Sequence, residues 1–243
     1  MAPIRKGDGT PLEIPGVSEV RSGDGRVFFE GDAIPDSEID YFERSNVEFY
    51  NDESDGDGSA IVTSPVSPSS GLTIDSSTRA LEFTHDGTRT RIASAENDGL
   101  PYYPQRGDVI IFDVYIQDSD DIAAPFWGYK GEFDGDFAYL TGFKYDDGEM
   151  FITKERSDRD LLAVTSASPP TNEWIRGRFD WGSPTLTFDW IPIDENPADA
   201  TPIESISADD TDFDSGGIGF HGNNNSGGSG SGNDQYYDNV GTL

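Results

Sequence analysis

Residues 108–117 read Asp-Val-Ile-Ile-Phe-Asp-Val-Tyr-Ile-Gln and carry the strongest strand signal in the chain. The stretch is rich in β-branched and aromatic residues and contains no glycine or proline, which is typical of a β-strand. Shorter stretches of the same kind follow and precede it. We expect further strands at 79–84, 138–143, 149–154, 173–181, 185–191, 216–221 and 235–240.

Turn signals separate these strands at intervals of about 8–12 residues. Asp146-Asp147-Gly148 predicts a hairpin, and Gly182-Ser183-Pro184 predicts another turn. No segment of about ten residues or more has the periodicity of an amphipathic helix. The strongest helix candidate, residues 154–162, lies between strand signals and is interpreted as a loop. The sequence therefore predicts an all-β fold, an antiparallel β-sandwich of the jelly-roll type.

The charge of the chain is extreme. Its 243 residues include 16 Lys and Arg against 47 Asp and Glu, so the formal net charge is −31. Such a chain repels itself in dilute buffer, whereas near 1 M salt the Debye length of about 3 Å screens the repulsion. The composition resembles that of proteins from extremely halophilic archaea, so we expect a fold that needs salt. The alternative is an acidic protein that merely repels nucleic acid.

Composition also excludes several classes of function. The chain has no cysteine, which excludes disulfides and thiolate metal sites. Its charge argues against a nucleic-acid partner. No run of about 18 apolar residues exists, so we expect no membrane insertion. No apolar stretch follows Arg5 and Lys6, so we expect no signal peptide.

The first 35 residues differ from the rest in charge and pattern. Gly7-Asp8-Gly9 and Gly23-Asp24-Gly25 form a small repeat, and each precedes an apolar run. Asp-Gly pairs favour tight turns, so we expect two short hairpins or arcs there. A segment of about 35 residues cannot bury a core of its own. We therefore predict that residues 1–35 form an anchor that docks on another surface, and that residues 36–243 form the sandwich.

The order of the strand motifs resembles the concanavalin A-like (laminin G-like) jelly roll. The motifs are Ile39-Asp40-Tyr41-Phe42-Glu43, Gln105-Arg106-Gly107-Asp108-Val109-Ile110-Ile111-Phe112-Asp113, Asn172-Glu173-Trp174-Ile175, Gly217-Ile218-Gly219-Phe220 and Tyr237-Asp238-Asn239-Val240. Separately, residues 7–20 (Gly-Asp-Gly-Thr-Pro-Leu-Glu-Ile-Pro-Gly-Val-Ser-Glu-Val) resemble the N-terminal module of structural proteins from haloarchaeal tailed viruses and proviruses. The second resemblance implies a virion protein, which is made in the host cytoplasm and leaves by lysis.

Three acids at alternate positions, Glu132, Asp134 and Asp136, form the sharpest enzymatic motif. They resemble the Glu-x-Asp-x-Glu strand of laminarinase-like retaining glycosidases, in which two carboxyls about 5–5.5 Å apart act as nucleophile and acid/base. The third position here is Asp136, whose side chain is shorter, and Gly135 weakens a strand. We expect no catalysis, and a solvated loop or hairpin instead.

The jelly-roll resemblance also implies one structural Ca²⁺ or Mg²⁺ that ties the opening strand to the last strand. Its ligands would be Asp40 or Glu43 together with Asp238, since hard cations take carboxylate and carbonyl oxygens. The acidic loop at residues 52–58 departs from the spacing of an EF-hand. The alternative is that the loops of a brine-adapted protein are acidic in any case.

A group of aromatic residues suggests a sugar-binding surface. Tyr102, Tyr103, Trp127 and Tyr129 lie in loop-like sequence with Lys130 beside them. Aromatic faces stack on pyranose rings, and nearby prolines would stiffen the loops and lower the ordering cost of recognition. We predict ligand contact at these five residues. The alternative is that the aromatics fill the core or a subunit interface.

These observations predict a surface structural protein of a haloarchaeal virus particle, either a tail fibre or receptor-binding protein or a capsid turret or decoration. It would be a homo-oligomer, attached to other virion proteins through residues 1–35 and touching host surface glycans or glycoprotein. One alternative is a glycoside hydrolase or depolymerase that acts on host polysaccharide. A third possibility is a purely structural decoration protein.

Overall fold

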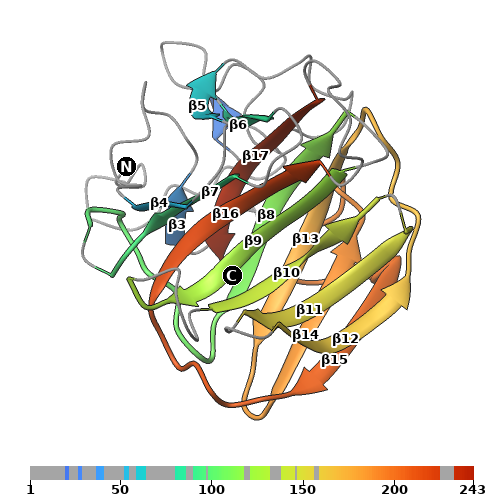
Figure 1. Ribbon diagram of the computed structural model, residues 1–243. Coiled ribbons are helices and arrows are strands. Elements are labelled where there is room, and N and C mark those ends of the chain that lie inside the picture. The colour runs from blue at the N-terminus through green and yellow to red at the C-terminus, as the bar shows by residue number, and fades with distance from the viewer. Residues whose placement is uncertain are drawn as a thin grey trace, which may run out of the picture.

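In the computed structural model, the chain folds into two facing antiparallel sheets (Figure 1). The described residues are 20–21, 27–28, 37–40, 52–54, 59–63, 80–85, 90–96, 98–117, 121–131, 138–145, 147–155, 159–224 and 233–243. Before residue 80, and at 83–85, 90, 121, 223–224 and 233–234, only the backbone is described. None of these residues belongs to a helix, and none therefore forms a helix that could cross a membrane.

The 7-stranded sheet has the strand order β12-β11-β10-β9-β16-β7-β4. In that order its strands are Asp160–Ser166, Glu149–Glu155, Ala138–Lys144, Asp121–Tyr129, Gly217–Asn224, Thr90–Ser94 and Asp52–Ser54. The 8-stranded sheet has the order β15-β14-β13-β8-β17-β6-β5 with β3 also paired to β17. Its strands are Glu204–Asp209, Thr185–Ile191, Trp174–Trp181, Val109–Ile116, Asn233–Thr242, Ala80–His85, Ser59–Thr63 and, for β3, Ser37–Asp40.

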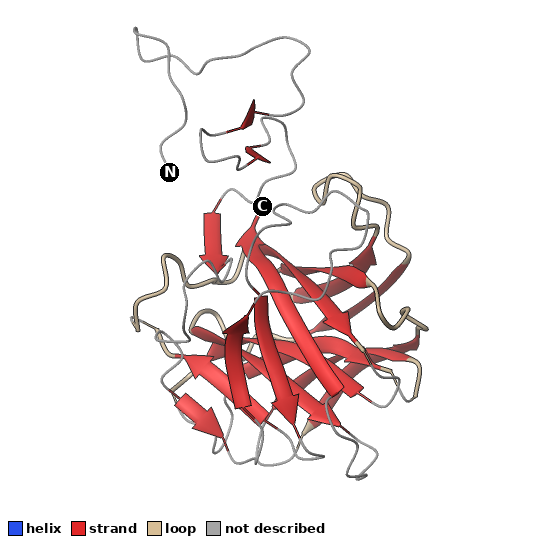
Figure 2. Ribbon diagram, turned by 90° about the horizontal axis from the view of Figure 1, so that it is seen from above, coloured by secondary structure: helices blue, strands red, loops and turns tan. Residues whose placement is uncertain are grey.

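The core lies between the two sheets, which face each other in the view from above (Figure 2). Strand β8 shows why the sequence folds this way, because Ile110, Phe112 and Val114 point into the core while Asp113 and Tyr115 point outward. Side chains that alternate along a strand face opposite sides of its sheet. The predicted antiparallel β-sandwich is thus confirmed.

The predicted hairpin at 146–148 joins β10 to β11, with Lys144 opposite Glu149 and Gly148 at a φ of 60°. The expectation that residues 154–162 form a loop is wrong at both ends. Lys154 belongs to β11, and β12 begins at Asp160 and pairs with β11. A β-strand forms there because Leu162 and Ala163 pack against the core.

In the N-terminal segment, β1 (Val20–Arg21) and β2 (Val27–Phe28) form an antiparallel pair on either side of Gly23-Asp24-Gly25. The two strands that flank the second repeat are thus paired as a hairpin there requires. Both repeats lie outside the described residues, as do residues 7–19 of the virus-like stretch. The division of the chain at residue 35 stays a prediction.

Both faces of the 7-stranded sheet bury apolar side chains. One face closes the core, and the opposite face carries a second buried cluster in which Phe126, Leu140 and Phe151 take part. Strand β9 lies at the middle of this sheet and reads Asp-Ile-Ala-Ala-Pro-Phe-Trp-Gly-Tyr, so it has no polar alternation to reveal its period. This is the pattern expected of a strand that is buried on both sides.

Candidate functional site

Three segments meet at one end of the sandwich and bring together several of the predicted ligand-binding residues. They are the connection from β7 to β8 (95–108), the residues just after β9 (130–131) and the connection from β15 to β16 (210–216). Gln105 forms an isolated antiparallel bridge with Ser215. The exposed Lys130 donates from Nζ to the Ser215 carbonyl oxygen at 2.6 Å. We call this region the Tyr102 end.

Arg106 holds the Tyr102 end together. Its guanidinium donates to Oδ1 of Asp214 at 2.7 Å, to the Gly182 carbonyl at 2.6 Å and to the Phe213 carbonyl at 2.6 Å. The Arg106 side chain is only 12 % exposed, whereas that of Asp214 is 80 % exposed. Arg106 thus ties its own connection to residues 210–216 and to the β13–β14 turn, and Lys130 ties the residues after β9 to the same 210–216 segment, so these positions are fixed before any ligand arrives.

The two tyrosines are held by their hydroxyls. The Tyr102 hydroxyl donates to Oδ2 of Asp108 at 2.8 Å, and burial, together with this bond to a carboxylate, raises the pKa of Tyr102 to about 12. The Tyr103 hydroxyl lies 2.9 Å from Oγ of Ser94 and accepts the Gly99 amide at 3.1 Å. Both rings are half-buried against the core, so each keeps part of its surface in solvent at a fixed angle.

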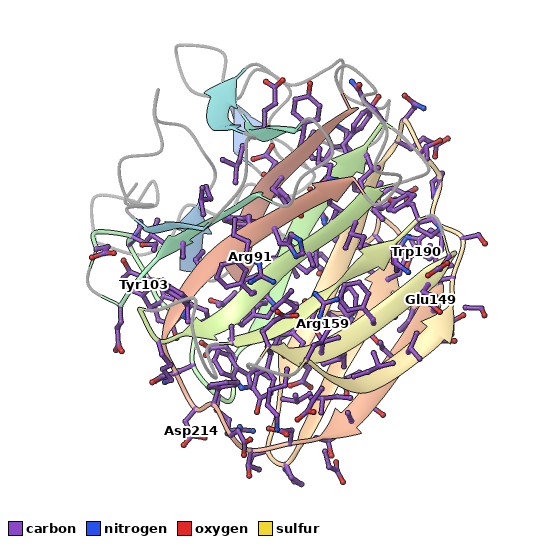
Figure 3. All side chains as sticks on the ribbon, in the orientation of Figure 1. Arg91, Tyr103, Glu149, Arg159, Trp190 and Asp214 are labelled. Carbon is purple, nitrogen blue, oxygen red and sulfur yellow. The ribbon has the colours of Figure 1, made fainter. Side chains whose placement is uncertain are left out.

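The Tyr102 end therefore offers the groups that recognise polyols. The exposed side chains of Gln105, Lys130 and Asp214 provide an amide, an ammonium donor and a carboxylate acceptor. The partly exposed rings of Tyr102 and Tyr103 belong to the same connection as Gln105. Figure 3 shows Tyr103 at the left of the molecule and Asp214 at its lower left. Ligand contact at Tyr102, Tyr103 and Lys130 stays a prediction.

The placement of Trp127 and Tyr129 in a surface loop is wrong. Both belong to β9, where Trp127 is 0 % exposed and Tyr129 is 2 % exposed. Trp127 stacks on Phe179 in the core at a centroid distance of 6.2 Å, and its Nε1 donates to Oγ1 of Thr141 at 2.9 Å. Pro125 and Gly128 are residue types that favour loops, which explains the loop-like sequence. Both lie within β9, where Gly128 adopts a φ of 83°. Neither aromatic side chain presents a surface to a ligand in this fold.

The predicted cation site is described only in part. The opening and last strands do lie together, because β3 pairs with β17 and Asp40 stands opposite Val240. The side chain of Asp40 and all of Glu43 lie outside the described residues. Asp238 is buried at 6 % exposure and accepts the Asn239 amide at 2.8 Å. Within the described part of the chain, no group of three acidic or histidine side chains could hold a metal.

A buried guanidinium supplies positive charge near Asp238. Arg176 donates from Nε and Nη2 to the two carboxylate oxygens of Asp113 at 2.6 and 2.8 Å. Burial alone would lower the pKa of Arg176, but the charge and hydrogen bonds of Asp113 and the charge of Asp238 outweigh it and raise the pKa. Arg176 therefore offsets part of the negative charge of Asp113 and Asp238. The structural Ca²⁺ or Mg²⁺ stays a prediction.

The possible catalytic acids Glu132, Asp134 and Asp136 lie outside the described residues. The expectation that they do not form a glycosidase site is therefore untested.

Sequence reasoning missed a second acidic triplet, Asp210, Asp212 and Asp214. Lys154 of β11 donates to Oδ2 of Asp210 at 2.5 Å and to Oδ2 of Asp212 at 2.7 Å. The Tyr139 hydroxyl donates to Oδ1 of Asp210 at 2.5 Å, and burial followed by this bond raises the pKa of Tyr139 to about 12. Burial alone would raise the pKa of Asp210, but the bonds from Lys154 and Tyr139 outweigh it and lower the pKa. The network fixes the segment that also carries Asp214.

A second polar group was also missed, on the outer face of the 7-stranded sheet. Arg91 of β7 donates from Nη2 to Oε2 of Glu155 of β11 at 2.9 Å. Four strand spacings separate these strands, about 19 Å in a flat sheet, so the sheet must curve toward this face for the two side chains to meet. Arg159 donates from Nε to the same carboxylate. Figure 3 shows Arg91 and Arg159 over the middle of this sheet.

Comparison with known proteins supports the fold. No family model matches the sequence, and no curated protein matches it. A Bacillus licheniformis beta-glucanase matches with a TM-score of 0.51 and 11 % identity, over 83 % of this chain and 95 % of that chain.

Two Bacillus subtilis structures match with lower scores. A protein of unknown function with a galectin-like fold gives a TM-score of 0.49 at 12 % identity, over 76 % of this chain and 88 % of that chain. The carbohydrate-binding module CBM66 gives 0.48 at 13 % identity, over 67 % and 85 %. The fold assignment rests on the glucanase. This chain is therefore a jelly-roll β-sandwich of the concanavalin A-like kind.

Proposed function

We propose that this chain is a glycan-binding protein, and that the Tyr102 end is its contact surface. The observation that supports this most is the fixed geometry of that end, where Arg106 bonds residues 213–214 and Gly182, Lys130 bonds Ser215, and the side chains of Lys130 and Asp214 are exposed. A surface that is ordered before binding loses little conformational entropy when a ligand arrives. The shared fold with a protein named a beta-glucanase supports the same proposal.

The contact surface would read a sugar through two kinds of interaction. The half-buried faces of Tyr102 and Tyr103 offer apolar area for a ring, at low entropic cost because their hydroxyls are already bonded. Gln105, Lys130 and Asp214 offer donors and acceptors for hydroxyl groups. Lys130 would favour a sugar that carries a carboxylate or sulfate, since it is an exposed cation on a chain with a net charge of −31.

The test is a glycan array of neutral, sulfated and uronic-acid oligosaccharides, probed in about 2 M KCl and followed by calorimetry on the binders. Lys130→Ala and Gln105→Ala should each weaken binding by about tenfold, the loss of one good polar contact. Lys144→Ala is the matched control, because Lys144 lies at the β10–β11 hairpin and bonds Asp147 there. Silence across the array, or equal losses from all three variants, would contradict the proposal.

We also propose that the chain binds without cleaving. Asp136 stands where the glycosidase pattern has a longer acid, and Gly135 precedes it. The check is an assay for reducing ends released from each bound polysaccharide. Release that Glu132→Gln abolishes would make the chain a glycoside hydrolase instead.

We further propose that the glycan-binding domain is carried on the surface of a haloarchaeal virus particle, as a tail or capsid component anchored by residues 1–35. The resemblance of residues 7–20 and the acidic, lysine-poor composition support this placement. Mass spectrometry of purified particles should find the chain in the virion. Its absence from particles that are otherwise complete would contradict the virion role and leave glycan binding untouched.

A further inference from the structure

Strand β12 (Asp160–Ser166) is a free edge of the 7-stranded sheet. One side of its backbone pairs with β11, and no strand of the described chain pairs with its other side. In Figure 1, β12 lies at the opposite end of the sheet from β4. An edge of this kind presents a row of backbone donors and acceptors that another strand can join.

The side chains of this edge are unusually apolar for a solvent-facing strand. Leu161 is 58 % exposed and Val164 is 43 % exposed, and both are among the few large apolar side chains exposed in the described part of the chain. Exposed edges are usually protected by lysine, proline, inward-pointing charges or a β-bulge. From Leu161 to Ser166 the strand has no charged residue and no proline, in a chain with a net charge of −31, and only a shift of register beside Leu161 interrupts it.

Leu161 and Val164 point to the same face despite their odd spacing. Val164 stands opposite Phe151, and Leu161 stands opposite Thr153 after a shift of register. A bulge that places one extra residue on one strand produces this pattern. Phe151 belongs to the buried cluster on the outer face of the sheet. Leu161 and Val164 extend this apolar face to the edge strand, where their side chains are exposed to solvent.

The edge of the other sheet provides the contrast. Strand β15 (Glu204–Asp209) ends the 8-stranded sheet, and its exposed residues are Ser205, Ser207 and Asp209. It carries an acid at each end and buries its isoleucine, Ile206, at 8 % exposure. Thus β15 carries an acid at both ends, whereas β12 carries one acid, Asp160, and is uncharged from Leu161 to Ser166.

We propose that β12 pairs antiparallel with β12 of a second copy of this chain, so that the two 7-stranded sheets become one continuous sheet. A two-fold axis through the strand satisfies the free backbone groups of both copies with one another. It also places the Asp160 end of each strand beside the neutral Ser166 end of its partner, so no two carboxylates meet. Because β12 is uncharged and mainly apolar from Leu161 to Ser166, it matches the same strand of a second copy. A basic partner would instead bind the acidic surfaces elsewhere on this chain, whose net charge is −31.

Ile203, which is 52 % exposed, extends the contact area. Its neighbour Glu204 accepts from Oγ1 of Thr165 at 3.3 Å, so the residues before β15 lie beside β12. The pairing works against the charge of two strongly acidic chains. The dimer should therefore tighten as salt rises, because screening removes the long-range repulsion while the strand pairing stays.

Sedimentation equilibrium of the full chain in about 2 M KCl tests the pairing. The chain of 26.5 kDa should sediment with twice that mass. Leu161→Lys and Val164→Lys should each raise the dimer dissociation constant by about thirtyfold or more, because each places an ammonium group where an apolar side chain would be covered by the partner copy. Ser207→Lys on β15 makes the same charge change at the other edge and should leave the constant within about twofold.

The absence of cysteine allows a second, independent readout. With the two-fold axis at position 164, Val164→Cys stands opposite its own copy and should give a disulfide-linked dimer under mild oxidation, since directly opposed cross-strand residues lie within disulfide range. Ser207→Cys should give no disulfide-linked dimer. A folded parent chain that sediments as a monomer in concentrated salt would overturn the proposal. So would a trimer, or equal cross-linking at positions 164 and 207. Circular dichroism of every variant separates loss of pairing from loss of fold.

Discussion

Replacing Trp127 by alanine should destabilise the protein rather than abolish a surface contact. The ring is 0 % exposed, stacks on Phe179 and lies 5.8 Å from the Phe112 ring. Truncating a buried tryptophan typically costs about 3–5 kcal/mol. The change also leaves Oγ1 of Thr141 without its indole donor, which adds about 1–3 kcal/mol for a buried hydroxyl.

A domain of this size loses about 2–4 °C in Tm for each kcal/mol. The two costs sum to about 4–8 kcal/mol, so the melting temperature of Trp127→Ala should fall by roughly 8–32 °C, as read by circular dichroism in concentrated KCl. Trp190→Ala is the matched control, because Trp190 is half-buried and meets Phe143 with centroids 6.4 Å apart. It should lose less than half as much. A Trp127→Ala protein that melts within a few degrees of the parent would refute the reasoning, above all if it had lost glycan binding.

Three further outcomes follow from the same structure. Gly142→Ala should lower the free energy of unfolding by about 1–3 kcal/mol, because the new Cβ would lie 2.2 Å from the Ala123 carbonyl oxygen. An unchanged midpoint in a denaturant titration would contradict the packing of β9 on β10. Stability should fall between pH 10 and pH 12, because unfolded tyrosine loses its proton near pH 10 while Tyr139 and Tyr102 hold theirs to about 12. The stability that comes from these two raised pKa values is fully present below pH 10. In a pH series of denaturant midpoints, Tyr139→Phe should make the fall in stability between pH 10 and pH 12 less steep. Dialysis into dilute buffer should unfold a chain with a net charge of −31, and an unchanged circular dichroism spectrum would contradict its adaptation to salt.

The sequence predicts those parts of the fold in which local pattern and tertiary environment agree. Strand β8 alternates core and outer residues without a break, and it lies within the predicted residues 108–117. The β10–β11 hairpin follows from its Asp-Gly turn. In both places the chemistry of a few neighbouring residues is enough, because turn geometry and side-chain alternation are local properties.

The failures arise where burial on both faces hides the local pattern. Strand β9 contains Pro125 and Gly128, and its two apolar faces remove the alternation that marks a half-buried strand. The sequence around Trp127 and Tyr129 therefore resembles that of a loop, although both residues lie in β9. The network of Tyr139, Lys154 and Asp210 was missed for another reason, since Asp210 lies 56 residues from Lys154 and 71 residues from Tyr139 and no local signal connects them. In the Tyr102 end, sequence identified the tyrosines but not Arg106, whose role depends on distant acceptors, the carbonyl groups of Gly182 and Phe213 and the carboxylate of Asp214.

Chemical-shift mapping tests the central claim most directly. An isotopically labelled chain in concentrated KCl would be titrated with the oligosaccharide that gives the strongest array signal. If the Tyr102 end is the contact surface, saturable chemical-shift changes should concentrate at Tyr102, Gln105, Lys130 and Ser215, with little change along β12. Saturable shifts confined to another surface, or no shift with any oligosaccharide of the array, would contradict it.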